Sequence, residues 1–251
     1  MSLKISTETI RNDYVPIDVI AKQQTLTRRV ILEYIDSVDV VEYPIYFRKV
    51  DQNERDEESE EALQESLSRA RNSIVSLARA NKWEWFITLT FDPKEFPSFD
   101  FDAVGEYFSK FWNKLKRKFP DIKYLAVPEL HHDRFKYHFH MLLSGLPSRY
   151  FMLSATEKLP NNHNLLLWDY FTTCVPVADK SSDKIGFYIA KYFTKEFDFH
   201  FNKKRYFRTY NLDDPKCLYV GWVSETSIES NSYVIKNQEG RIVYVRTRYE
   251  K

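Results

Sequence analysis

The chain has 251 residues, with 37 Lys+Arg against 36 Asp+Glu, a formal net charge of +1 and only five glycines. No two glycines lie closer than 19 residues and none precedes a lysine. This excludes a Walker phosphate loop and a dinucleotide-binding loop, which both need clustered glycines beside phosphate. Without an apolar run of roughly 20 residues or the basic-then-apolar order of a signal peptide, we expect a soluble cytoplasmic protein. The two cysteines are too few for a disulfide framework or a Cys-rich zinc site.

The N-terminal part combines predicted strands with an acidic segment. Residues 28–49 are rich in β-branched and aromatic side chains, which predicts two or three strands with a turn at Asp36 and Ser37. In residues 51–65, eight acids against Arg55 give a local charge of −7, and an apolar pattern of helical spacing follows. Acids suit the positive end of a helix dipole, so we interpret this segment as a solvated helix entrance.

From residue 83 onward, strands and helices alternate. Residues 85–91 predict a strand with Thr88 and Thr90 on one face and apolar side chains on the other. The further predicted elements are a helix over 101–119 with a basic end, strands over 123–130 and 137–144, a helix over 183–195 and a basic strand over 205–210. This order favours an α+β fold, an antiparallel sheet covered by helices.

Four of the six histidines lie between residues 131 and 140. In a strand, His138 and His140 point to the same face, while Phe139 points to the core. Two neutral imidazoles make half of a metal site, and Glu129 on the preceding strand is placed to complete it. Such a set suits Mg²⁺ or Mn²⁺ acting on phosphate, with Zn²⁺ as an alternative. The competing interpretation is a solvated strand face, with His131 and His132 exposed in the turn.

The predicted helix over 183–195 carries two phenols and three ammoniums within a sector of roughly 100°. These residues are Lys184, Tyr188, Lys191, Tyr192 and Lys195. A tyrosine that attacks a DNA phosphate forms a covalent phosphotyrosine and releases a 3′ hydroxyl, and Lys191 could neutralise the developing charge. The alternative is an amphipathic surface helix, whose adjacent apolar stripe, formed by Ile185, Ile189 and Phe193, packs on the sheet.

Three segments together resemble a known family. FITLTF (86–91), HFH (138–140) and YIAKYFTK (188–195) are similar, in order and approximate spacing, to motifs 1, 2 and 3 of the HUH-type rolling-circle replication endonucleases. The closest likeness is to the phage and plasmid initiators grouped with the filamentous-phage gene II protein and the microvirus A protein. YLAVPELHHD (124–133) and RYFRTYNLDDP (205–215) also resemble that group, so the resemblance covers about residues 72–215.

The resemblance implies a central antiparallel sheet of the RNA-recognition-motif-like HUH type. It implies that His138 and His140 are metal ligands with Glu129 as the third, that Tyr188 is a nucleophile with Lys191 as its catalytic lysine, and that Tyr192 is a second nucleophile. The residues expected near bound DNA are Thr88, Thr90, Lys184, Lys195, Lys203, Lys204 and Arg205. The expected domains are an N-terminal β extension with the acidic helix entrance (1–70), the HUH endonuclease domain (71–215), and a C-terminal β-rich extension packing on the same domain (216–251).

The resulting hypothesis is a metal-dependent endonuclease and strand transferase that nicks single-stranded DNA at a replication origin and initiates rolling-circle replication. Its expected cofactor is Mg²⁺ or Mn²⁺, and its expected partners are origin DNA and a host helicase and polymerase in a bacterial cell, with no membrane. A non-catalytic origin-binding or promoter-binding module and an HUH relaxase or transposase are the alternatives.

The near-zero net charge averages over segregated segments. Residues 107–123 carry six bases and one acid (+5), and residues 184–208 carry seven bases and two acids (+5). These basic segments flank the predicted site and are suited to follow a DNA backbone.

Overall fold

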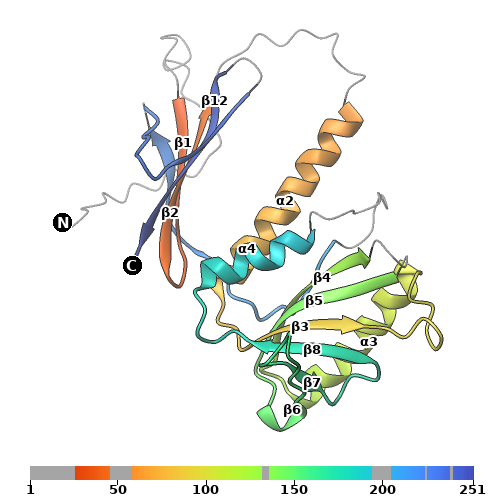
Figure 1. Cartoon of the computed structure of the whole chain (residues 1–251). Helices are drawn as coiled ribbons and strands as arrows, with labels where there is room; N and C mark the ends of the chain where they lie inside the picture. Colours follow the sequence, from red (N-terminus) through yellow and green to blue (C-terminus); the bar gives the residue numbers. More distant parts are fainter. Residues whose placement is uncertain (1–25, 46–57, 132–135, 194–204, 224, 238–239) are drawn as a thin grey trace. The chain divides into compact units, whose positions relative to one another are not determined.

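The computed structural model describes residues 26–45, 58–131, 136–193, 205–223, 225–237 and 240–251 (Figure 1). The chain divides into two compact units, one formed by residues 1–57 with 215–251 and the other by residues 58–214. Each unit contains one antiparallel sheet, so the α+β class expected from the sequence is confirmed. In the part of the chain that is described, no helix combines the length and the apolar character needed to cross a membrane.

The first unit is a five-stranded sheet with the order β10-β1-β2-β12-β11. Its strands are β1 (Leu26–Glu33), β2 (Ser37–Ile45), β10 (Lys216–Val223), β11 (Tyr233–Lys236) and β12 (Ile242–Glu250). β1 pairs with β10 and β2 pairs with β12, so strands from both ends of the sequence share one sheet. The buried carboxylate of Glu42 accepts a hydrogen bond of 2.7 Å from Arg29, as a buried charge requires.

The second unit is built on a seven-stranded sheet with the order β6-β7-β8-β3-β5-β4-β9 (Figure 1). Its strands are β3 (Trp85–Thr90), β4 (Lys123–His131), β5 (Lys136–Ser144), β6 (Phe151–Leu153), β7 (His163–Leu165), β8 (Phe171–Pro176) and β9 (Phe207–Arg208), with a 3₁₀ turn at Ser148–Tyr150. The strands predicted around residues 85–91, 123–130 and 137–144 are confirmed as β3, β4 and β5, and the last two form a hairpin in which Glu129 lies opposite His138.

Three described helices accompany this sheet, namely α2 (Glu58–Ala80), α3 (Phe101–Lys118) and α4 (Ser182–Phe193). α3 begins where the Asp100 side chain accepts hydrogen bonds from the backbone N–H groups of residues 102 and 103. It covers one face of the sheet, whereas α4, packed against α2, covers part of the other (Figure 1). We call these the α3 face and the α4 face.

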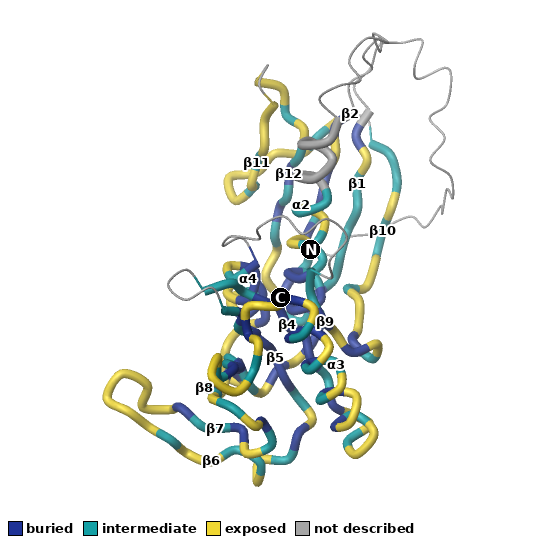
Figure 2. Tube along the Cα trace, turned by 90° about the vertical axis from the view of Figure 1, so that its right-hand side faces the viewer, coloured by how far each residue is buried: buried dark blue, intermediate teal, exposed yellow. Residues whose placement is uncertain are grey.

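Because helices cover both faces, the central strands β4 and β5 are buried along much of their length (Figure 2). Successive side chains of a strand point to opposite faces. Ile87, Leu89 and Phe139 are fully buried on the α3 face. Thr88 and His140 point to the α4 face, as the sequence predicted. The expected apolar stripe of α4, formed by Ile185, Ile189 and Phe193, is also buried.

A buried ion pair joins α2 to α4. The Arg79 side chain is almost completely buried and forms an ion pair with Asp183, the acid in the first turn of α4. A Cβ added at Gly186 would lie 2.9 Å from Cγ of Arg79 and 3.2 Å from the Val75 carbonyl oxygen. Glycine therefore permits the two helices to approach closely, which fixes the position of α4 on α2.

Candidate active site

Three rows of side chains cross the α4 face of the sheet. Residues that lie directly opposite on neighbouring strands share a face and a row. In strand order β8, β3, β5 and β4, the rows are Val175-Phe86-Leu142-Leu125, Thr173-Thr88-His140-Val127 and Phe171-Thr90-His138-Glu129. The first row packs in the apolar cluster beneath α2 and α4. The other two rows carry the polar groups, so the candidate site begins where that apolar cluster ends.

The histidines are oriented by threonines on β3. Oγ1 of Thr88 lies 3.1 Å from Nδ1 of His140, and Oγ1 of Thr90 lies 3.0 Å from Nδ1 of His138. When Nδ1 carries the proton and the threonine oxygen accepts it, Nε2 of each ring keeps its lone pair. Both histidines are thus held with Nε2 as the nitrogen able to bind a ligand.

The two Nε2 atoms have different surroundings. Nε2 of His140 lies 2.6 Å from a carboxylate oxygen of Glu129. Nε2 of His138 is buried and has no hydrogen-bond partner among the described residues. Burial, followed by the positive charge of Lys136, lowers the pKa of His138 to about 4. His138 is therefore neutral at neutral pH, with its lone pair available.

The tyrosines of α4 meet the histidines. The Tyr192 ring stacks on the His140 ring at a centroid distance of 3.6 Å and an angle of 20°. The Tyr192 hydroxyl donates a hydrogen bond of 2.9 Å to the Tyr188 hydroxyl. Burial, and then this hydrogen bond, raise the pKa of Tyr192. Tyr188 packs edge-on against Phe86 and is 49% exposed, so its hydroxyl is the more accessible of the two.

The donor set fits a divalent metal chemically, because two imidazole nitrogens and one carboxylate are ligands for such ions. The orphaned Nε2 of His138 fits as well, since a buried polar atom without a partner is costly unless something binds it. Within the described ranges, no group of three His, Cys, Asp or Glu side chains is arranged to hold an ion. The Glu129 oxygen is instead bonded directly to His140, so metal binding requires that hydrogen bond to open.

The remaining predicted residues lie at different distances along the chain from this cluster. Lys184 and Lys191 are exposed on α4. Arg205 is partly buried, and its Nη1 has no hydrogen-bond partner in the part of the chain that is described. His131 is the last residue of β4 and lies with its ring 5.3 Å from that of His138, so its placement in a turn was wrong. Lys195, Lys203, Lys204 and His132 lie outside the described residues.

The sequence analysis missed one exposed aromatic residue on this face. Phe171 begins β8, lies opposite Thr90 and is 66% exposed, so it extends the outer polar row. An exposed ring beside a candidate DNA site is suited to contact a base. The alternation of β8 was the available signal, but the strand lies in a stretch whose pattern was difficult to interpret.

Comparison with known proteins gives one family match. Residues 84–197 match the model of a family of replication-associated proteins, described by its members ORF2 and the gene II protein. The matched segment runs from β3 to beyond α4 and contains Thr88, Glu129, both site histidines and both tyrosines. No curated protein and no solved structure matches the chain. Over the segment that carries the candidate site, the chain is thus similar to replication-associated proteins, which supports a replication initiator.

Proposed function

We propose that the protein is a metal-dependent endonuclease and strand transferase that nicks single-stranded DNA to initiate rolling-circle replication. The observation that carries the proposal is the contact between the histidine strand and the tyrosine helix, in which Tyr192 stacks on His140 and hydrogen-bonds Tyr188. A nucleophile beside two candidate ligands is the arrangement that phosphoryl transfer through a covalent intermediate needs. The family match supports the replication role.

In this proposal Tyr188 attacks first. Its hydroxyl is exposed to an incoming strand, and it accepts the hydrogen bond donated by Tyr192, which stabilises the negative charge that develops on the attacking oxygen. The Tyr188 oxygen forms a bond to phosphorus, and the bond from phosphorus to the 3′ oxygen breaks. The phenol loses its proton, and the departing 3′ oxygen gains one. The products are a 5′-phosphotyrosine and a free 3′ hydroxyl, which primes a host polymerase.

The other residues hold the site ready for this step. His138, His140 and Glu129 would hold Mg²⁺ or Mn²⁺, which supplies Lewis-acid polarisation of the scissile phosphate when bound. Thr88 and Thr90 keep the imidazoles in one orientation. Lys191, one turn from Tyr188 on α4, lies on the exposed side of the helix and neutralises charge on the phosphate. Tyr192 is the second nucleophile, which receives the strand in a later transfer, and a host helicase opens the duplex.

The test is trapping of the covalent adduct. The full chain is incubated with Mn²⁺ and circular single-stranded DNA from the replicon that carries its gene, and protein–DNA adducts are separated under denaturing conditions. Peptide mapping is expected to find the phosphate on Tyr188. Tyr188→Phe should remove the first adduct and the Tyr188→Phe/Tyr192→Phe double variant all adducts, while Tyr233→Phe, an exposed tyrosine of the five-stranded sheet, should change nothing.

Two results would count against the proposal. An adduct that forms undiminished in the double variant would mean that neither tyrosine is the nucleophile. Tight, chelator-independent DNA binding by the wild type without any adduct would instead favour a non-catalytic origin-binding module.

A further inference from the structure

A basic pocket lies on the α3 face, on the side of the sheet opposite to the tyrosines. It has a volume of about 650 Å³ and combines the C-terminal half of α3 with residues that follow β9. Its lining residues are Lys110, Asn113, Lys116, Arg117, Pro120 and Tyr210. Because α3 and α4 pack on opposite faces, this pocket is separate from the candidate active site.

The charge of the pocket exceeds what α3 needs. Residues 110–118 contain five bases and no acid. The three bases of the last turn, residues 116–118, complement the negative end of the helix dipole, but Lys110 and Lys114 lie N-terminal of that turn. Lys110 forms an ion pair of 2.6 Å with Glu106, but both side chains are largely exposed, so this pair is weak and easily exchanged for a phosphate.

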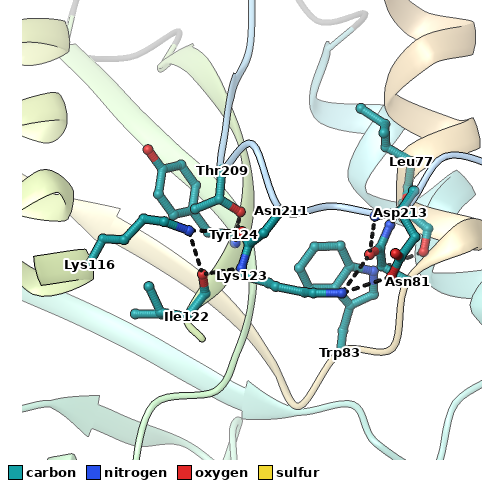
Figure 3. A network of polar contacts seen from close by, with 11 residues as sticks. Leu77, Asn81, Trp83, Lys116, Ile122, Lys123, Tyr124, Thr209, Asn211 and Asp213 are labelled. Carbon is teal, nitrogen blue, oxygen red and sulfur yellow. Dashed lines mark hydrogen bonds and ion pairs between the residues drawn. The ribbon is translucent and has the colours of Figure 1, made fainter. Parts of the chain in front are cut away.

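Tyr210 is the most exposed of the large hydrophobic residues described, at 86%. Such a ring is normally free to move, yet both of its neighbours in sequence are held in place. Thr209 exchanges two hydrogen bonds with the Tyr124 backbone, at 3.1 and 3.2 Å. Asn211 accepts a hydrogen bond of 2.9 Å from Lys116, as Figure 3 shows.

The clamp continues beyond Asn211. Asn81 accepts a hydrogen bond of 2.9 Å from the backbone N–H of Asp213, and Lys123 forms an ion pair of 2.8 Å with the Asp213 carboxylate (Figure 3). The ammonium of Lys116 also lies 4.3 Å from the centre of the Tyr210 ring. The backbone on both sides of Tyr210 is thus fixed while its ring stays open to solvent, which lowers the entropy lost when a flat partner stacks on it.

We propose that this pocket is a second binding site for single-stranded DNA, in which one base stacks on Tyr210 while Lys110 and Arg117 contact the flanking phosphates. A fixed aromatic ring among cations is the combination that binds single strands irrespective of sequence. Paired bases in a duplex are already stacked on one another, so the ring selects an unpaired strand. The choice of DNA over RNA rests on the proposed function; the binding site itself does not.

The experiment probes the pocket locally, in the full chain and with chelator present so that no strand is cut. A single-stranded 12-mer carrying 5-iodouracil is bound and photo-crosslinked, and the modified peptide is mapped. A crosslink on Tyr210 is expected. In parallel, binding of the same strand is measured by fluorescence anisotropy over a series of salt concentrations, with duplex DNA and RNA of the same sequence as comparisons.

Tyr210→Ala is expected to weaken binding roughly 5- to 100-fold, the range found for loss of one base–aromatic stack, whereas Tyr210→Phe should bind within about twofold of the wild type. The Lys110→Gln/Arg117→Gln double variant should lower the salt slope by about 1.4, or about 0.7 for each phosphate contact. Lys158→Gln, an exposed lysine between β6 and β7, is the charge control and should leave the slope unchanged.

Absence of a crosslink at Tyr210, or equal binding by Tyr210→Ala and the wild type, would overturn the proposal. Tighter binding of RNA or duplex would overturn the assignment to single-stranded DNA. Because no cleavage takes place in this experiment, its failure leaves the tyrosine adduct test standing, and failure of that test leaves this result standing.

Discussion

The two faces of the seven-stranded sheet are made by alternate residues of the same strands, yet they differ in almost every physical respect. On the α3 face, Phe108 and Phe139 stack with ring centroids 4.3 Å apart, and both are fully buried. On the α4 face, only one of the three rows is apolar throughout. One face thus stabilises the sheet, and this leaves the other free to carry costly groups such as the unpartnered Nε2 of His138.

The largest expected effect comes from emptying the α3 face. Phe139→Ala should lower the free energy of unfolding by about 3–5 kcal/mol, because it leaves a cavity among closely packed rings. The measurement is urea denaturation. The matched control is Phe171→Ala on the α4 face, where the same side chain is 66% exposed and its loss should cost under about 1 kcal/mol. Equal costs would mean that the two faces do not differ as described.

The next effect concerns the attachment of α4. Asp183→Asn removes the charge that pairs with the buried Arg79, and it should cost about 3 kcal/mol of unfolding free energy, because an uncompensated buried guanidinium remains. The rate of tyrosine adduct formation should also fall, since α4 carries both tyrosines. Glu106→Gln, which breaks the exposed pair with Lys110, is the control and should cost under about 1 kcal/mol. If the two substitutions prove equally mild, the ion pair does not hold α4.

A smaller effect is expected from the threonines, which act through the histidines. Thr88→Val and Thr90→Val keep the side-chain shape but remove the hydroxyl that orients each imidazole. Mn²⁺ affinity, measured by EPR titration, should fall about 10- to 100-fold for each. Thr173→Val is the control, because Thr173 shares the row of Thr88 on the neighbouring strand. Unchanged Mn²⁺ affinity in all three variants would remove the orienting role from Thr88 and Thr90.

The smallest effect is a pH dependence specific to the α4 face. Because the pKa of His138 is lowered to about 4 from 6.5, the folded state binds fewer protons than the unfolded state between these values. Its contribution to stability is fully present above pH 6.5 and is lost as the pH falls toward 4. NMR titration of the metal-free protein should place the midpoint of the His138 ring near pH 4. A midpoint near 6.5 would show that burial does not govern this group.

The parts that the sequence predicted are those set by local spacing. Period-two alternation placed Thr88 and Thr90, and likewise His138 and His140, on one strand face, and the four-residue spacing of Tyr188 and Tyr192 placed both on one helix face. The threonine-to-histidine hydrogen bonds depend on the register of β3 against β5, which local spacing does not reveal. The metal, the nucleophile order and the DNA contacts stay predictions.

Other features could not be predicted because they join distant segments. The pairing of β1 with β10 brings Thr27 opposite Val223, and no short-range pattern marks it. The sequence analysis accordingly treated the two ends of the chain as separate extensions. The exposed Tyr210 gave no signal either, because its pocket forms only when the segment after β9 meets the end of α3.

The shared sheet of the two ends has a consequence for how the protein is made. During synthesis, residues 58–214 leave the ribosome as an uninterrupted segment, so the unit with the candidate site can fold while the chain is still growing. β1 and β2 are made first, but their outer partners β10 and β12 are made last. The early hairpin must therefore wait with both edges unpaired, and such edges invite pairing with other chains. We expect the five-stranded sheet to be the slower unit to form, because closing it requires contacts across almost the whole sequence.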